Sequence, residues 1–344
     1  MTGDGNLVAR LYGRGDIRVA PEAVTAPPGE EMIRVEAVGL CGSDLHWFDE
    51  GSIGDASLDR PLVLGHEFSG VIADGPRAGE RVVADPFDPC ERCEWCRAGR
   101  SNLCATGRFA GFTGTDGALR TTMPWPGRLL RALPDEIGTE DAALLEPLGV
   151  ALHAFDLGEV QAGGRVGVFG CGPIGLLLVQ LARRAGASVV VATDRLEHRV
   201  AAALAAGATD GLVILDRSQS GATDGRGSSG PIDVAFETSG DDDALTDAIA
   251  AVRPGGRVVL VGIPDGDRTA FRAGDARRKE LTLQLSRRML PGDLTTAIDL
   301  VTSGQVDLSG LITDRLPIAD AARAFALAAS RRGLKVIVNP GSSV

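Results

Sequence analysis

The chain carries the sequence Val-Gly-Val-Phe-Gly-Cys-Gly-Pro-Ile-Gly at residues 166–175. Its glycines, Gly170, Gly172 and Gly175, have the spacing Gly-x-Gly-x-x-Gly. In a strand–turn–helix unit, the first glycine permits a tight turn and the second lets a pyrophosphate approach the backbone, while the third allows close helix–strand packing. Residues 165–169 have the character of a buried strand, and residues 174–185 that of an apolar helix. This context favours a dinucleotide site, which includes Pro173, over a plain β–α turn.

Asp194 ends the next predicted strand, 24 residues after Gly170. A carboxylate at that place accepts hydrogen bonds from the hydroxyls of an adenosine ribose and repels a 2′-phosphate. The sequence therefore favours NAD over NADP, although Arg195 and Arg199 could partner a phosphate. Asp194 could instead only cap the helix that follows it.

Strand-like and helical segments alternate after Glu146, which predicts a parallel sheet with helical crossovers. Before residue 145, short strand-like runs separated by Gly, Pro and Asp predict an irregular, mostly antiparallel β domain. Beyond residue 290, two amphipathic helices are expected at residues 293–302 and 318–329, followed by a strand at 335–338. A length of 344 residues fits two domains better than one.

The composition is that of a soluble globular enzyme, with 44% hydrophobic and 24% charged residues. The formal charge is −11 and basic residues form no block, which argues against nucleic acid and anionic membranes as partners. Residues 1–10 lack the apolar core of a signal peptide, and the longest apolar stretch is too short to span a bilayer. We therefore expect a cytoplasmic protein.

Four of the six cysteines form a cluster with the spacing C-x2-C-x2-C-x7-C: Cys90, Cys93, Cys96 and Cys104. Four thiolates so close together can complete a tetrahedral zinc shell with no open position, which indicates a structural metal site. Two disulfides, or a zinc module that binds a partner, are the alternatives. Disulfides conflict with a reducing compartment, and the local charge is not basic.

A second set of candidate ligands is dispersed along the chain. Cys41 lies in Gly-Leu-Cys-Gly-Ser-Asp-Leu-His (39–46), while His66 and Glu67 lie in Gly-His-Glu-Phe-Ser-Gly (65–70). A thiolate, an imidazole and a carboxylate can bind zinc and leave one position for a substrate. Taken singly, the same residues could be a buried cysteine, a core histidine and a surface glutamate.

These motifs resemble the zinc-containing medium-chain dehydrogenases, specifically the sorbitol (L-iditol) dehydrogenase branch. The resemblance extends over nearly the whole chain, because the Gly-His-Glu segment, the four-cysteine lobe and the glycine loop occur in the family's order. It implies a GroES-like, mostly β catalytic domain at residues 1–147, with the zinc lobe at 85–107. A Rossmann domain with a doubly wound parallel sheet follows at 148–285, and residues 286–344 return to the catalytic domain. The fold class is thus α/β.

The cysteine inventory indicates the branch. Alcohol dehydrogenases of this family bind catalytic zinc with two cysteines and a histidine, but here Cys171 lies in the glycine loop and only Cys41 remains. The second cysteine of those enzymes is replaced by Glu146. Resemblance to polyol dehydrogenases implies Cys41, His66 and Glu67 as the direct ligands, with Glu146 holding or exchanging with a metal-bound water.

Further roles are implied by the resemblance alone. Ser43 and His46 would relay the proton released from the substrate. Contacts to NAD are expected from Ile174, Arg199, Val261, Gly262, Ile263, Ser286, Arg287 and Arg288. Substrate contacts are expected from Trp47, Glu146, Arg288 and Met289, where Trp47 and Met289 replace tyrosines that are frequent in the branch.

The expected reaction moves a hydride from a secondary alcohol of a polyol or sugar to NAD and yields a ketone. Threonine, glucose or a simple secondary alcohol is the alternative substrate within the family. A catalytically silent zinc- and nucleotide-binding regulator is the alternative of another class, against which the intact set of Cys41, His66 and Glu67 argues. A homodimer or homotetramer is expected from the family.

Overall fold

The computed structural model describes residues 6–214 and 230–341. These form two compact units, Met1–Pro147 with Leu290–Val344, and Leu148–Met289. Residues 286–289 thus lie in the second unit, whereas the sequence predicts the C-terminal return from residue 286 onward. The difference arises because the Ser286 amide still donates to the Leu260 carbonyl and prolongs the strand pairing there. Among the described residues, no helix is long and apolar enough to cross a membrane.

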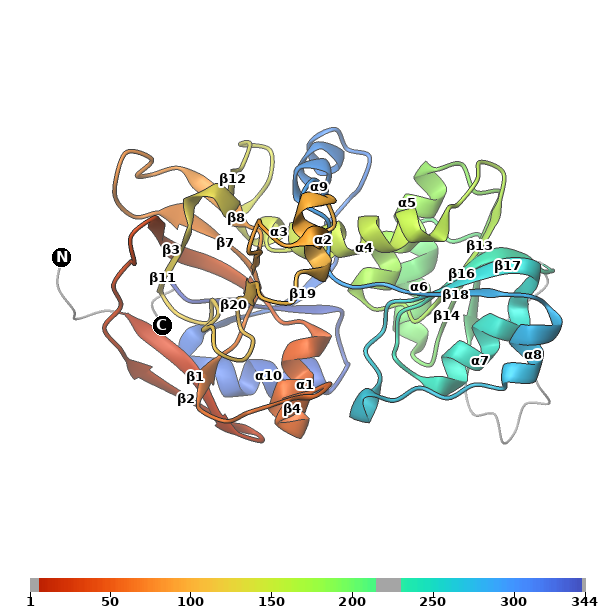
Figure 1. Ribbon diagram of the computed structural model, residues 1–344, viewed down its shortest axis with the longest axis horizontal. Coiled ribbons are helices and arrows are strands. Elements are labelled where there is room, and N and C mark those ends of the chain that lie inside the picture. The colour runs from red at the N-terminus through yellow and green to blue at the C-terminus, as the bar shows by residue number, and fades with distance from the viewer. Residues whose placement is uncertain (1–5, 215–229, 342–344) are drawn as a thin grey trace. The chain divides into compact units, whose positions relative to one another are not determined.

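The first unit contains a 7-stranded, mostly antiparallel sheet in the order β12-β8-β7-β3-β20-β19, with β11 paired to β3. The blue C-terminal strands β19 and β20 join the red and orange N-terminal ones in this sheet (Figure 1). Its strands are β3 (Glu30–Gly39), β7 (Glu67–Ile72), β8 (Arg81–Ala84), β11 (Thr122–Pro126), β12 (Leu130–Ala132), β19 (Ile312–Pro317) and β20 (Lys335–Asn339).

A second sheet of the same unit has the order β2-β1-β6. Two further two-stranded sheets, β4-β5 and β10-β9, are separate from it. The bounds are β1 (Leu7–Gly13), β2 (Asp16–Pro21), β6 (Leu62–Val63), β4 (Ser52–Ile53), β5 (Ala56–Ser57), β9 (Phe87–Asp88) and β10 (Arg108–Phe109). Helices α1 (Gly42–Glu50) and α10 (Ala321–Ala329) pack beside these strands. The core between them contains Trp47, Phe68, Trp125 and Phe325, each at most 1% exposed. Shorter helices are α2 (Glu94–Arg97) and α3 (Thr139–Ala142), and α9 spans Asp293–Thr302.

The second unit is a 6-stranded parallel sheet in the order β15-β14-β13-β16-β17-β18. The strands are β13 (Arg165–Phe169), β14 (Val189–Asp194), β15 (Asp210–Val213), β16 (Ile232–Glu237), β17 (Val252–Leu260) and β18 (Thr282–Leu285). Strand order reverses between β13 and β16, the point at which doubly wound sheets bind ligands at their carboxyl ends. Helix α4 (Leu145–Gly158) leads into this unit.

Helices cover both faces of this sheet (Figure 1). Helix α7 (Asp242–Ala251) packs on β13, β16 and β17 through a cluster that includes Phe169, Leu245 and Val258. Helix α8 (Ala273–Arg278) contacts α7, while α5 (Pro173–Arg184) and α6 (Glu197–Ala205) pack on β13, β14 and β15. A parallel sheet with helical crossovers is the architecture that the alternating sequence pattern predicts, so the Rossmann part of the predicted fold class is confirmed. The antiparallel sheet of the first unit confirms the mostly β part.

Candidate functional site

The first unit brings Cys41, His66 and Glu67 together. One ligand atom of each, a sulfur, a ring nitrogen and a carboxylate oxygen, lies within 4.8 Å of the other two. Cys41 caps the start of α1 directly after β3, and Glu67 begins β7. Strands β3 and β7 pair antiparallel, with Gly39 opposite Glu67. The end of β3, which leads to Cys41, therefore lies beside the start of β7, which carries Glu67. His66 and Glu67 are 5% and 1% exposed, which argues against a surface role.

Asp44 links the two segments, and sequence reasoning did not single it out. Its carboxylate accepts hydrogen bonds from the Cys41 amide at 3.0 Å and the Gly65 amide at 3.2 Å. The same carboxylate lies 3.5 Å from His66 Nδ1, an arrangement that orients an imidazole and leaves Nε2 for a metal. Burial lowers the pKa of His66, but Asp44 and Cys41 outweigh it and raise that pKa well above its ordinary value.

Lys335 is the partner of the Glu67 carboxylate. Its ammonium lies 2.6 Å and 2.8 Å from the two Glu67 oxygens and donates to the Leu40 carbonyl at 3.1 Å. Burial lowers the pKa of Lys335, whereas Glu67 and then Cys41 raise it, with a net upward shift. The side chain therefore stays an ammonium although it is only 4% exposed. No sequence motif pointed to this residue, which lies 268 positions after Glu67.

Glu146 is a second buried carboxylate at this site. It is 5% exposed, and burial raises its pKa to about 8 although His66 and Lys335 act in the opposite direction. A buried carboxylate is costly unless hydrogen-bond donors or a cation are nearby. Together with a thiolate and an imidazole, this donor set fits zinc.

Both predicted relay residues lie on helix α1, and Ser43 reaches this site. Ser43 Oγ is 3.5 Å from His66 Nε2. On the same helix, His46 Nδ1 is 2.6 Å from Glu50 Oε1, one turn later. Glu50 thus holds the ring of His46, and the i,i+4 spacing was the sequence signal that could have indicated it. Trp47 is 1% exposed and packs edge-on against Phe112, so its substrate contact stays a prediction.

The cysteine lobe has the geometry of a metal site. One sulfur of each of Cys90, Cys93, Cys96 and Cys104 lies within 4.8 Å of the others, and all four are free thiols. The sulfurs of Cys93 and Cys96 are 3.4 Å apart, too far for a disulfide bond. The Thr106 hydroxyl and the amides of Arg92 and Cys93 lower the pKa of Cys90 to about 5. The disulfide alternative is therefore not supported, and four sulfurs fit a closed zinc shell.

The glycine loop has the predicted shape. Gly170 has φ +106°, and a Cβ at Gly175 would lie 2.0 Å from the Gly170 carbonyl oxygen, so only glycine fits both places. At Gly172, the nearest atom to an added Cβ is an Arg199 nitrogen at 3.8 Å, which leaves room above the loop. Pro173 begins helix α5 and Ile174 follows in its first turn. Thr238, which sequence reasoning missed, donates to the Gly170 carbonyl at 2.7 Å.

Asp194 lies beside this loop at the end of β14. Its carboxylate accepts from the Cys171 amide at 2.8 Å and from the Leu196 amide at 2.9 Å, so it both supports the loop and begins the next turn. Arg195 is held elsewhere, 2.6 Å from Asp241, which is also the side-chain cap of α7. Of the two arginines that blurred the choice of cofactor, Arg195 is therefore already paired, and Arg199 lies by Gly172.

The remaining predicted cofactor residues follow β17 and β18. Strand β17 ends at Leu260, and the amides of Val261 and Gly262 beyond it both donate to the Glu237 carbonyl. Ile263 is 40% exposed. The buried Ser286 hydroxyl has no hydrogen-bond partner among the described residues, an arrangement that fits a bound dinucleotide. Arg287 is exposed, Arg288 has φ 55°, and Met289 is 6% exposed.

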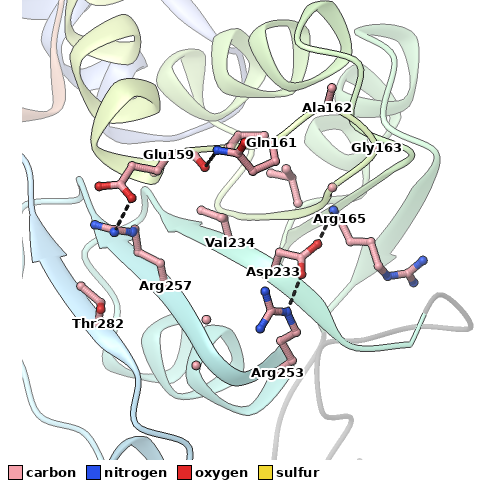
Figure 2. A pocket seen from close by; sticks show the side chains of 16 residues that line it. Glu159, Gln161, Ala162, Gly163, Arg165, Asp233, Val234, Arg253, Arg257 and Thr282 are labelled. Carbon is pink, nitrogen blue, oxygen red and sulfur yellow. Dashed lines mark hydrogen bonds and ion pairs between the residues drawn. The ribbon is translucent and has the colours of Figure 1, made fainter.

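The second unit also contains a cavity of about 520 Å³ at the amino ends of its strands, away from the carboxyl ends that carry the glycine loop (Figure 2). Its charged residues pair among themselves, with Arg253 2.5 Å from Asp233 and Arg257 2.8 Å from Glu159. Arg165, which begins β13, donates its amide to Asp233 at 2.8 Å. Because dinucleotides bind at the carboxyl ends of such sheets, this cavity is not the cofactor site.

Comparison with known proteins identifies the family. Residues 173–303 match the model described as zinc-binding dehydrogenase, and residues 27–135 match the alcohol dehydrogenase GroES-like domain. A probable D-xylulose reductase A from Aspergillus clavatus is 36% identical over 325 residues, which cover 90% of this chain and 89% of that relative. The chain belongs to the zinc-binding dehydrogenases. The resemblance predicted from the sequence is thus confirmed.

Two further relatives agree with this assignment. The zinc-binding dehydrogenase described here is 34% identical to sorbitol dehydrogenase of Bacillus subtilis over 323 residues, 90% of each chain. The crystal structure of L-idonate 5-dehydrogenase from Escherichia coli superposes with a TM-score of 0.88 at 26% identity, covering 97% of this chain and 98% of that one. The protein is a zinc- and nicotinamide-dependent oxidoreductase of the polyol dehydrogenase branch.

Proposed function

We propose that this zinc-binding dehydrogenase oxidises a secondary alcohol of a polyol or sugar to a ketone and reduces NAD. The observation that carries the proposal is the set of Cys41, His66 and Glu67 with the buried Glu146 beside it, in place of a second cysteine. The relatives named as D-xylulose reductase and sorbitol dehydrogenase support the same substrate class.

Within this proposal, Cys41, His66 and Glu67 hold the catalytic zinc, and Cys90, Cys93, Cys96 and Cys104 hold the structural zinc. When bound, zinc supplies a Lewis acid for the substrate hydroxyl, and nicotinamide supplies the hydride acceptor. Asp44 keeps the His66 ring in place through Nδ1. Ser43, 3.5 Å from His66 Nε2, takes up the proton of the substrate hydroxyl, and His46 passes it on while Glu50 holds the ring.

The dinucleotide is proposed to bind at the glycine loop, with Gly170, Gly172 and Gly175 admitting the pyrophosphate and Asp194 accepting from the ribose hydroxyls. Ile174, Arg199, Ser286 and the segment 261–263 are proposed contacts to it. Trp47, Arg288 and Met289 are proposed to contact the substrate, together with Glu146. Arg287 is proposed as a further cofactor contact on the strength of the family resemblance.

Appearance of NADH at 340 nm tests the proposal with a panel of pentitols, hexitols, sugars, inositols, threonine and simple secondary alcohols. The highest kcat/KM is expected for a polyol, because several polar groups surround the metal ligands. A preference for threonine, glucose or a monohydric alcohol would reassign the substrate. No turnover with any of them, in protein loaded with two zinc ions, would favour a regulator.

Cofactor choice gives a separate prediction. Asp194→Ala is expected to weaken NADH binding about tenfold, because hydrogen bonds of the ribose hydroxyls to a carboxylate are lost. NADPH binding is expected to strengthen, because the negative charge that opposes the 2′-phosphate is removed. Fluorescence titration of both nucleotides measures the ratio of the two dissociation constants. Asp210→Ala, which removes an aspartate at the start of β15, serves as the control. An unchanged ratio of the two dissociation constants in Asp194→Ala would contradict the prediction.

A homodimer or homotetramer is also proposed. Leu285 is 68% exposed on β18, the edge strand of the parallel sheet, and an exposed edge strand is a ready pairing surface. Light scattering on the purified protein measures the mass, and a monomer would contradict this proposal. The free cysteines favour a reducing compartment, which supports a cytoplasmic location.

A further inference from the structure

Lysine is almost absent from this chain. Of its 35 lysine and arginine residues, only Lys279 and Lys335 are lysines. Arginine presents a broad planar fork, whereas lysine presents a compact ammonium with three donors. Lys279 uses that compact head to donate to the carbonyls of Ile249, Ala250 and Val252 at the end of α7. The other place where this chain keeps a lysine is the metal centre.

The Lys335 ammonium is fully enclosed at that centre. It donates hydrogen bonds to the two Glu67 oxygens, at 2.6 Å and 2.8 Å, and to the Leu40 carbonyl at 3.1 Å. A guanidinium would not fit, because Lys335 is 4% exposed and Glu67 1% exposed. Leu40 directly precedes Cys41, so one ammonium binds both segments that carry the metal ligands. Lys335 itself comes from β20, in the C-terminal segment.

The Glu67 carboxylate is confined from the other side as well. A Cβ on Gly39 would lie 2.2 Å from Glu67 Oε2, so glycine at position 39 leaves the space that this oxygen occupies. Both oxygens of Glu67 already accept from an ammonium, and each retains a second lone pair for a metal. An ammonium and a divalent cation thus attract the same carboxylate and repel each other.

We propose that Lys335 is a positioning residue of the metal centre, which holds Glu67 in place and limits how tightly the catalytic zinc is bound. The inference rests on the proposed function, in which Cys41, His66 and Glu67 hold that zinc. A centre held less tightly leaves Glu146 and the substrate hydroxyl able to compete for the metal. Lys335 thereby favours exchange of ligands on the zinc ion over a coordination shell that stays permanently filled by protein ligands.

The test measures zinc affinity in Lys335→Met, a side chain of similar length without charge. Release of zinc to a chromophoric chelator gives the dissociation constant of each ion, because the four-cysteine lobe and the three-ligand site release at different chelator concentrations. Removal of a positive charge beside Glu67 is expected to tighten the more weakly bound ion by about tenfold or more. Lys279→Met, which removes the other lysine of the chain, is the matched control and is expected to leave both constants unchanged.

Each outcome separates this inference from the proposed function. A wild-type chain that holds only one zinc ion would contradict the catalytic site itself. Two ions in the wild type, with the same or weaker affinity in a folded Lys335→Met, would overturn the role of Lys335 alone. Lys335→Gln, which stays neutral but can still donate to Glu67, has the same expected result and replaces the methionine variant if that variant does not fold. Cobalt substitution adds a visible spectrum of the site, expected to change in the Lys335 variants and not in Lys279→Met.

Discussion

His66→Ala is expected to lower kcat/KM by about a thousandfold or more, because a zinc Lewis acid contributes several kcal/mol to the barrier. The imidazole is one of three proposed zinc ligands, and the Asp44 carboxylate orients it through Nδ1. The zinc content should fall from two ions per chain to the one held by the cysteine lobe. Metal analysis and steady-state kinetics with the best polyol of the panel measure both effects.

Binding of NADH should survive this change. The glycine loop belongs to the unit Leu148–Met289, whereas His66 belongs to the other. His198→Ala is the matched control, since the same side chain is removed from an exposed position on α6. Retention of both zinc ions and of turnover in His66→Ala would refute the proposed ligand set. Loss of NADH binding together with turnover would instead point to general unfolding.

Glu67→Ala is expected to destabilise the protein by about 3–5 kcal/mol, the cost of leaving one member of a buried ion pair without its partner. Lys335 would lose two of its three acceptors and the carboxylate that raises its pKa, with only the Leu40 carbonyl left to accept from the buried amine. The free energy of unfolding of metal-free protein, from urea titration, measures the loss. Turnover should disappear as well.

The double variant Glu67→Ala/Lys335→Met distinguishes the cause. It removes both charges, and replacement of a buried ion pair by apolar groups is often close to neutral. Most of the stability lost in Glu67→Ala should therefore return in the double variant, while turnover should not. A double variant as unstable as Glu67→Ala would show that the carboxylate is required for reasons other than its pairing with Lys335. Glu50→Ala, at the partly exposed partner of His46, should lower stability far less.

The parallel sheet was predictable because its determinants are local. Strand β13 coincides with the apolar run 165–169, and α5 begins at the proline that follows Gly172, as a helix with proline in its first turn should. Helix α9 spans Asp293–Thr302 as its amphipathic pattern indicates. The strands β15 and β18 were not predicted, because they are only four residues long and partly exposed. Helix α10 begins at Ala321 rather than 318, since Ile318–Asp320 forms a 3-10 turn before it.

The sequence by itself determined the glycine loop and the four-cysteine lobe, because spacing along the chain and residue chemistry suffice for each, whereas resemblance to the family joined Cys41 to His66 and Glu67 as a predicted ligand set. Only the tertiary structure decided their partners: Asp44 for His66, Lys335 for Glu67, and Asp241 for Arg195. Lys335 and Glu67 are 268 residues apart, and no periodicity joins them. The sequence around a lone lysine in a strand does not indicate whether its ammonium contacts water or a carboxylate. Burial of the side chain in the folded sheet decides between the two.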